Sequence, residues 1–231
     1  MLKNIEAMGN YFYNSTDNYR VRRIKDEKDE AIVARYLDTY FYPQWTTTIS
    51  RNSDKETQIG GLDITVTGNT GNVFTIDEKA ATRWIGRSLQ TFSHEINSIN
   101  TRGEEYDGWL LDFKSTSDYL LEVWIDDARD TSLNDYTDIT DITIALVPKV
   151  NIWSYLKRNH VESGKLKEIG NELREREQKY TWYKGFKVTC QQNQQERAAN
   201  ILIPRDTLIN TISTYAVRIK NGKTTVLRKA I

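Results

Sequence analysis

Apolar residues in the segment 26–42 recur at spacings of three and four positions, which predicts an amphipathic helix with one broad hydrophobic face. Pro43 follows directly, as is typical of a helix end. Residues 45–50 combine aromatic and β-branched side chains and predict a strand. Residues 1–25 are polar and aromatic without a periodic pattern, so they predict no particular element.

Two strand-like segments follow, separated by a turn. Apolar and polar residues alternate in residues 60–67, and residues 73–80 form a second segment of strand character. Between them, residues 68–72 are a cluster of glycine, asparagine and threonine that favours a turn. The economical interpretation is a β-hairpin in which Thr67 lies opposite Val73.

The rest of the chain mixes helical and strand-like patterns. The expected elements are a helix at 86–100, strands at 108–112, 118–125 and 141–150, largely helical residues at 151–180, strands at 185–190 and 198–204, and a helix that begins at 205. This mixed order predicts an α/β or α+β fold. The chain has 231 residues and no repeat or clear linker, so we expect one domain, 1–231.

Composition excludes several classes of site. The chain is 38% apolar and 28% charged with a net charge of zero, which is typical of a soluble protein and argues against purely electrostatic nucleic-acid binding. Its single cysteine, Cys190, excludes a disulfide framework and a thiolate zinc site, and two histidines are too few for a histidine-rich metal site. Any metal is therefore expected to be a hard cation bound by oxygens. Without a recognisable signal peptide or a long apolar run, we expect a cytoplasmic protein with no membrane partner.

The predicted hairpin brings charged residues together. If Thr67 pairs with Val73, Asp63 lies opposite Asp77, and opposed residues have Cβ atoms about 4.5–5.5 Å apart. Two carboxylates at that distance repel each other, whereas a divalent cation between them would be coordinated. Lys79 lies two residues beyond Asp77 on the same face of its strand. This cluster contains the groups needed for metal-assisted phosphodiester hydrolysis.

The same residues allow plainer interpretations. An acid two residues before a lysine occurs by chance in many charged proteins, and an aspartate in a half-exposed strand is usually only solvated. Asp112 and Lys114 form a second acid-x-lysine pattern, in a segment that is predicted to be a turn. A shift of one residue in the hairpin register would place Glu78, rather than Asp77, on the face of Asp63. His94 is expected to be a surface residue.

The stretch from Asp63 to Lys79 resembles the signature of the PD-(D/E)xK nuclease superfamily. More narrowly, "IDEKAA", "LQTFSHEIN" and "GWLLD…SDYLLEVWI" are similar to a group of uncharacterised bacterial and phage members of that superfamily. The resemblance implies a restriction-endonuclease-like core of helix, three strands, helix and strand, with a central mixed β-sheet flanked by helices. That core would occupy about 26–150, and 151–231 would be a C-terminal extension. Leu62 stands where the motif's name has proline, and Glu78 fills its variable position.

The resemblance also implies roles for individual residues. Asp63 and Asp77 would bind Mg²⁺, for which Mn²⁺ could substitute, and Glu78 would be an alternative ligand or donate its backbone carbonyl. Lys79 would be the catalytic lysine. Many relatives carry a further acid on the first helix, for which Asp29 and Glu30 are candidates. A polar residue on the helix after the lysine strand often points at the active site, and Glu95 is the candidate here.

The candidate nucleic-acid contacts are Arg83, Trp84 and Arg87, because basic and aromatic side chains beside a site suit a phosphate backbone and an unstacked base. The leading hypothesis is a metal-dependent endo- or exodeoxyribonuclease. One alternative is a protein of the same fold that binds nucleic acid without cutting it. Another is a structural or interaction protein of a mobile element. Nucleic acid is the expected partner, with DNA preferred over RNA, and a homodimer is also compatible with the sequence.

Overall fold

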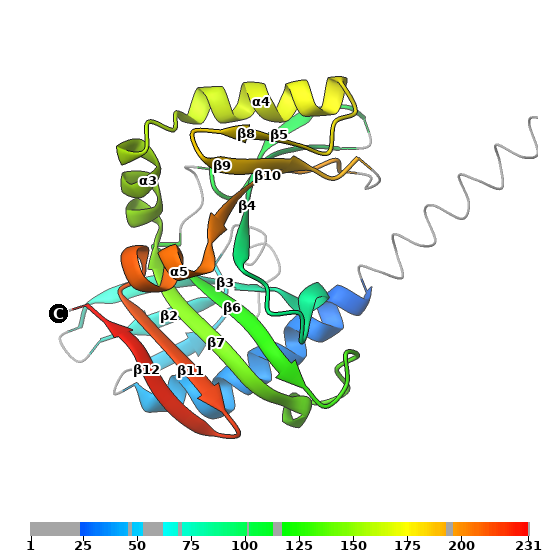
Figure 1. The fold of residues 1–231 in the computed structure, drawn as a ribbon. Coiled ribbons are helices and arrows are strands. Elements are labelled where there is room, and N and C mark those ends of the chain that lie inside the picture. The colour runs from blue at the N-terminus through cyan, green and yellow to red at the C-terminus, as the bar shows by residue number, and fades with distance from the viewer. Residues whose placement is uncertain are drawn as a thin grey trace, which may run out of the picture.

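The protein has an α+β fold with two β-sheets and a few helices (Figure 1). The computed structural model describes residues 24–45, 48–52, 62–68, 71–100, 102–112, 117–192 and 196–230. The larger sheet has seven strands in the order β1-β2-β3-β6-β7-β11-β12, and the smaller has five in the order β5-β4-β10-β9-β8. The larger sheet is mixed, because β3 and β6 are parallel while its other neighbouring strands are antiparallel.

The strands of the larger sheet are β1 (Thr48–Arg51), β2 (Ile64–Thr67), β3 (Val73–Ala80), β6 (Tyr119–Ala128), β7 (Ile139–Pro148), β11 (Tyr215–Lys220) and β12 (Lys223–Lys229). Those of the smaller sheet are β4 (Thr91–Ile99), β5 (Glu105–Asp107), β8 (Tyr180–Tyr183), β9 (Phe186–Cys190) and β10 (Ala199–Pro204). Residues 24–36 are α-helical and continue into η1 (Leu37–Phe41) and η2 (Tyr42–Gln44). The other helical elements are η3 (Thr82–Trp84), η4 (Tyr136–Asp138), α3 (Lys149–Arg158), α4 (Ser163–Glu175), α5 (Arg205–Thr207) and η5 (Leu208–Ile212).

Strand β6 is buried on both faces and separates two hydrophobic cores. Leu120 and Trp124 belong to the core that the larger sheet shares with the smaller sheet, α3 and α4. Leu121 and Val123 point to the other face and pack in the core that contains residues 33–42. Because successive side chains of a strand alternate between faces, a strand covered on both sides has a nearly continuous apolar sequence. This explains why residues 118–125 are so hydrophobic.

The predicted mixture of helices and strands is confirmed, and so is the hairpin. Thr67 pairs with Val73 and Ile64 pairs with Ile76, which is the register expected from the alternation and the turn. The helix expected at 26–42 is present as residues 24–36 with η1 and η2. The expected strand at 45–50 is present as β1, although residues 46 and 47 lie outside the described residues.

The helix expected at 86–100 is wrong, because residues Thr91–Ile99 form β4 of the smaller sheet. Phe92 and Ile96 are four residues apart, a spacing that fits one face of a helix and equally one face of a strand. The burial of His94, which lies between them in the sequence, distinguishes a strand from a helix. His94 is fully buried together with its two apolar neighbours, which is the period of two of a strand.

The strand expected at 108–112 is also wrong, because residues 109–111 form a turn against β4. The Gly108 N–H donates to the carbonyl of Ile96, and the Leu110 N–H donates to that of Glu95. A Cβ atom on Gly108 would lie 2.5 Å from the Glu95 carbonyl oxygen, so only glycine allows this close approach. Lys114, half of the second acid-x-lysine pattern, lies outside the described residues.

The segment after residue 150 contributes to both sheets. The predicted helical region appears as α3 and α4, and the predicted strands at 185–190 and 198–204 appear as β9 and β10. Beyond these, β11 and β12 extend the larger sheet, while β8, β9 and β10 build the smaller sheet with β4. The smaller sheet and its helices lie above the larger sheet in Figure 1.

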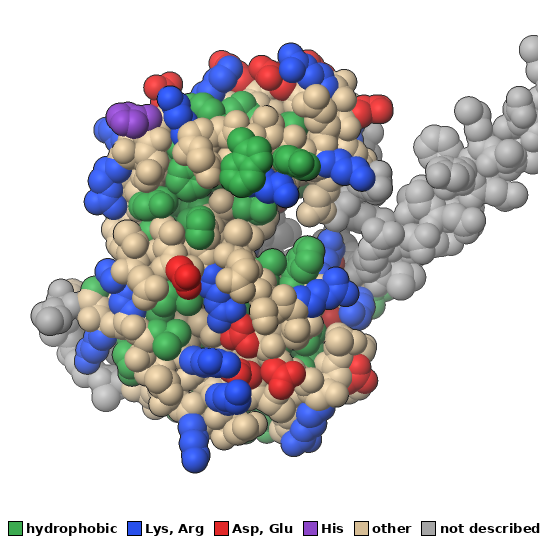
Figure 2. Space-filling model, in the orientation of Figure 1, with side chains coloured by type: hydrophobic (Ala, Val, Ile, Leu, Met, Phe, Trp, Pro, Cys, Tyr) green, Lys and Arg blue, Asp and Glu red, His purple; other side chains and the backbone are tan. Residues whose placement is uncertain are grey.

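Charged residues of both signs intermingle over the larger sheet on the face shown in Figure 2, whereas hydrophobic side chains gather over the smaller sheet. Arg218 and Lys220 pair with Asp141, and Arg205 pairs with Asp126. This pairing agrees with the zero net charge of the chain. The surface visible in this view therefore has no large patch of purely positive or purely negative charge. None of the described helices combines the length and apolar character needed to cross a membrane.

Candidate functional site

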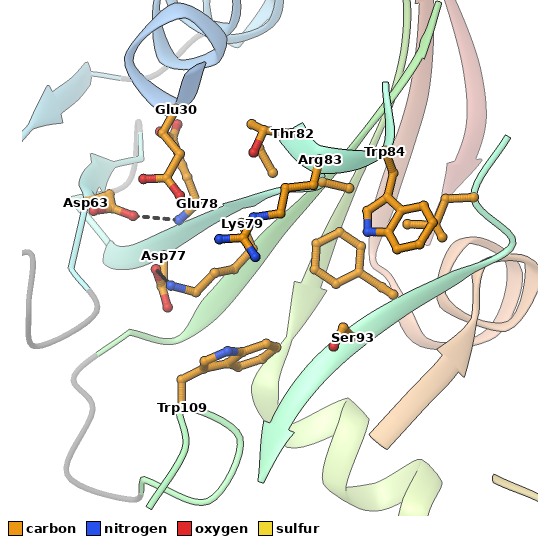
Figure 3. A pocket seen from close by; sticks show the side chains of 14 residues that line it. Glu30, Asp63, Asp77, Glu78, Lys79, Thr82, Arg83, Trp84, Ser93 and Trp109 are labelled. Atoms are coloured by element: carbon orange, nitrogen blue, oxygen red, sulfur yellow. Dashed lines mark hydrogen bonds and ion pairs between the residues drawn. The ribbon is translucent and has the colours of Figure 1, made fainter. Parts of the chain in front are cut away.

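A cavity of about 480 Å³ lies beside the end of β3 (Figure 3). Glu78 and Arg83 are part of its charged lining, and so are four further residues of the predicted site: Asp63 next to β2, Asp77 and Lys79 on β3, and Glu30 on the first helix. These four residues come from three separate segments of the chain. The structure therefore brings both aspartates, the lysine and the helix acid to one space, as the hairpin register predicted for the first three.

Asp77 and Lys79 form an ion pair within this cavity. The Lys79 Nζ lies 2.7 Å from Asp77 Oδ1, and the side chain of Asp77 is only 2% exposed. The second oxygen, Oδ2, is buried without a hydrogen-bond partner among the described residues. A buried carboxylate oxygen without a partner is costly, because it has lost its hydration without compensation. Such an atom is a natural point of attachment for a cation.

The electrostatics of the pair follow from its burial. Desolvation raises the pKa of Asp77 to about 6, although Lys79 opposes this, and the nearby charge of Asp63 adds to the rise. For Lys79, burial disfavours the ammonium, but the Asp77, Asp63 and Glu30 carboxylates outweigh that effect and raise its pKa. Lys79 is therefore a cation at neutral pH. Its side chain is 31% exposed to solvent.

Asp63 lies one residue before β2, where the regular ladder ends. Its N–H donates to the carbonyl of Ile76 at 3.1 Å, and its Oδ2 accepts the Glu78 N–H at 2.8 Å (Figure 3). This contact fixes the carboxylate beside β3. Glu30 approaches from the helix as an exposed residue. Partial desolvation of its carboxyl, followed by the charges of Asp26 and Asp63, raises its pKa against the opposing effect of Lys79.

The side chain of Glu78 points to the face opposite that of Asp77. Its Oε1 accepts the Tyr42 hydroxyl at 2.6 Å, and its Oε2 accepts Arg51 Nη1 at 2.7 Å. Arg51 also binds Asp38 on η1. Because both oxygens of Glu78 are engaged in this network, its carboxylate is a poor alternative to Asp77 as a metal ligand. Its contribution to the site is the backbone N–H that holds Asp63.

The remaining predicted residues differ in their placement. Arg83 and Trp84 line the cavity, where Arg83 pairs with Asp26. Arg87 lies outside the lining, with its guanidinium carbon 5.8 Å from the Trp84 ring centroid. Glu95 is on β4 rather than on a helix and does not line the cavity. Burial raises its pKa.

The expectation that His94 lies on the surface is wrong. His94 and Glu122 are both 0% exposed, and His94 Nε2 lies 2.8 Å from Glu122 Oε1. Glu122 is the register partner of Lys79 across β3 and β6. Glu122 therefore lies beside Lys79 on the neighbouring strand, on the same face of the sheet.

Of the residues in this region that were not predicted as site residues, four bear most on its chemistry. Phe92 and Ser93 on β4 and Trp109 in the following turn line the cavity. Lys149, the first residue of α3, is close enough to Asp77 and Lys79 to sense both charges, and its pKa is lowered, mainly by burial. Period-two alternation around His94 could have revealed the two β4 residues. No local pattern marks Trp109 or Lys149, which reach the site through tertiary contacts.

The metal-binding capacity of the site is limited to a few protein ligands. Among the described residues, no group of three or more His, Cys, Asp or Glu side chains is arranged so that it could hold a metal ion. Two carboxylates, one with a free buried oxygen, nevertheless fit Mg²⁺, which usually takes one or two carboxylates and keeps several waters. The remaining ligands would then be water and substrate oxygens.

Replacing Asp77 with asparagine is expected to stabilise the protein at neutral pH. The pKa of this carboxyl is raised from 3.8 to about 6 in the folded state, so the native protein binds more protons than the unfolded chain between these values. Stability therefore falls as pH rises through that window. Asp77→Asn should gain about 1–3 kcal/mol of unfolding free energy at pH 7 and much less at pH 4.

Denaturant unfolding of both proteins at several pH values measures this effect. Asp206→Asn, on the short helix α5, is the control and should leave the pH profile unchanged. A difference between the Asp77→Asn variant and the unmutated protein that stays constant from pH 4 to 7 would contradict the assignment.

No protein-family model, no curated protein and no solved structure matches the chain, so the function must be argued from the chemistry of this cavity.

Proposed function

We propose that this protein is a metal-dependent nuclease that hydrolyses phosphodiester bonds, preferably in DNA. One observation carries the proposal: the buried Asp77 carboxylate has one oxygen on Lys79 and the other without a partner, in a cavity shared with Asp63. Structural needs alone do not explain a second carboxylate beside a buried one, since like charges destabilise the sheet. A hard cation would convert this repulsion into binding.

Asp63 and Asp77 would hold the ion, Mg²⁺ or in its place Mn²⁺, with the backbone carbonyl of Glu78 as a further ligand. When bound, the cation supplies Lewis acidity toward a phosphate oxygen. Because Asp63 is fixed by the Glu78 N–H and Asp77 by Lys79, both carboxylates are oriented before the ion arrives. Because the carboxylates are already in position, they would not have to rearrange during the reaction.

Lys79 is suited to stabilising negative charge. Its neighbours raise its pKa, so the ammonium remains protonated and donates hydrogen bonds rather than accepting a proton. Placed against a phosphate, it would neutralise charge that develops as the phosphodiester bond breaks, or orient the attacking water. Lys149 adds a second positive charge nearby and would attract the same phosphate backbone.

The arrangement of strands around the site also supports the proposal, because it resembles the core of PD-(D/E)xK nucleases. β1, β2 and β3 are consecutive antiparallel strands, and β6 is parallel to β3. The preference for DNA comes from this resemblance. The departure is the connection between β3 and β6, which passes through β4 and β5 of the second sheet where the family has a helix.

The proposal predicts that the protein binds and uses a divalent cation. At Mg²⁺ or Mn²⁺ about ten times above its Kd, thermal unfolding should reveal a stabilisation of about 1.4 kcal/mol, since the ion binds only the folded site. Asp77→Asn should abolish this gain. Plasmid and single-stranded DNA should be cut in the presence of either ion and remain intact with EDTA.

The stabilisation by metal should also depend on pH. Protons compete for Asp77, whose pKa is about 6, so the gain should be full above pH 7 and small at pH 5. Binding of DNA without metal uptake or cleavage would favour a non-cleaving protein instead. Cleavage that persists in EDTA would contradict the proposal.

A further inference from the structure

The cavity has a second wall that the metal chemistry does not use. Opposite the acids it is lined by aromatic and aliphatic side chains: Trp84, Leu89, Phe92 and Trp109. Figure 3 shows the Trp84 and Trp109 rings on two sides of the space, with the Lys79 side chain extended toward Asp77. A site that only bound a metal and a phosphate would not need this apolar surface.

Backbone hydrogen bonds fix the position of the turn that carries Trp109. The turn that carries it is fastened to β4 through the N–H groups of Gly108 and Leu110, and the absence of a Cβ on Gly108 permits the close approach. On one side, the Trp109 ring centroid lies 5.1 Å from that of His94. On another, it lies 5.8 Å from Lys79 Nζ. A rigid aromatic ring is thus placed within one side-chain length of the proposed catalytic lysine.

We propose that this aromatic wall stacks a nucleobase of the strand being cut, so that the substrate is single-stranded or locally unpaired nucleic acid. This inference rests on the proposed nuclease function and specifies its substrate. A base and its own phosphate are only a few bonds apart, which matches a wall of rings beside a cluster of acids and lysine. A paired base is already stacked on both sides and is not free to enter.

The size of the cavity supports an extruded base over a whole duplex. About 480 Å³ is in the range of pockets for small organic ligands, roughly 300–1,000 Å³. It can admit one or two nucleotides, whereas a double helix would have to remain outside it. Stacking on a ring tolerates every base, because each base has a π-face. We therefore expect little sequence preference at this position.

The test measures binding separately from cleavage. Fluorescence anisotropy with a short labelled single-stranded oligonucleotide is recorded in EDTA and in Ca²⁺, for the unmutated protein and for Trp109→Ala. Loss of one stacked base should weaken single-strand binding about tenfold. An oligonucleotide with abasic sites should bind the unmutated protein as weakly as the intact one binds Trp109→Ala. A blunt duplex should bind both proteins equally and more weakly than the single strand binds the unmutated protein.

Trp182→Ala is the matched control, because Trp182 is 65% exposed on β8 and does not line the cavity. Trp109→Phe retains an aromatic ring and should recover most of the affinity, which separates stacking from a folding defect. Equal affinities of Trp109→Ala and Trp182→Ala, or a preference for the duplex, would overturn the inference.

Parallel cleavage assays keep the two proposals distinguishable. If metal-dependent cutting is intact while Trp109 has no effect on binding, only the stacking wall is wrong. If Trp109 governs single-strand binding but no cutting occurs with any metal, the nuclease proposal fails while the base-binding surface stands.

Discussion

Lys79→Ala is expected to slow metal-dependent cleavage by a factor of about 100 to 1,000, the usual effect of removing one preorganised charge or donor at a developing anion. The loss should appear in kcat more than in KM, since the ammonium would act on charge that develops during the reaction. Initial rates on single-stranded DNA at saturating Mg²⁺ measure it. Thermal unfolding of the same variant checks that the fold is retained.

A second readout separates a catalytic role of Lys79 from a structural one. Lys79 opposes the rise in the pKa of Asp77, so removing the ammonium should move that pKa above about 6. The pH at which half of the metal-induced stabilisation is lost should then shift upward in Lys79→Ala. An unchanged midpoint would show that the two side chains are not coupled.

Lys165→Ala provides the matched control. Lys165 also forms an ion pair at 2.7 Å, with Glu168, but on the surface of α4. Its replacement should leave the cleavage rate unchanged. If Lys79→Ala cuts DNA as fast as Lys165→Ala does, the assignment of Lys79 is wrong.

His94→Ala is expected to cause the largest loss of stability, about 3–5 kcal/mol of unfolding free energy. His94 and Glu122 are fully buried, and one oxygen of Glu122 is already without a partner among the described residues. Removal of the imidazole would leave the whole carboxyl group buried without its partner. Truncation also opens a cavity beside Phe92 and Trp109, whose rings contact His94.

Urea unfolding of the single variants and of the His94→Leu/Glu122→Leu double variant measures the pair. The double variant should lose less than the sum of the two single variants, because apolar residues can replace a buried pair when both partners are removed. His160→Asn is the control, since His160 is exposed and asparagine tolerates its positive φ of 57°. A loss below 1 kcal/mol for His94→Ala would contradict the importance of the pair.

Part of the site could be predicted because its geometry is local. The alternation in β2 and β3 and the short turn between them set the pairing of Thr67 with Val73, and this pairing carries Asp63 toward Asp77. Lys79 shares the face of Asp77 because strand side chains repeat every two residues. These relations depend on a segment of fewer than twenty residues, in which pattern and turn chemistry agree.

The two wrong predictions of secondary structure also have a physical cause. In residues 91–99, the four-residue spacing of Phe92 and Ile96 suits a helix or a strand, and the choice depends on which partner covers the segment. β10 supplies a ladder of backbone hydrogen bonds along β4, and β10 lies about a hundred residues later in the chain. Similarly, Leu110 and Leu111 are apolar because their turn is buried against the core shared by the two sheets, although they form no strand.

The sequence by itself determined which charged groups belong to the hairpin and which face they share, because the dihedral preferences and the period of a strand act over a few residues. Only the tertiary structure decided that these groups line a cavity, that Asp77 is buried with an unpartnered oxygen, and that Trp109 stands beside Lys79. Burial and desolvation depend on chain segments that are distant in sequence, here the first helix, β4 and the turn after Gly108. No periodic pattern within one segment can encode which of the others will cover it.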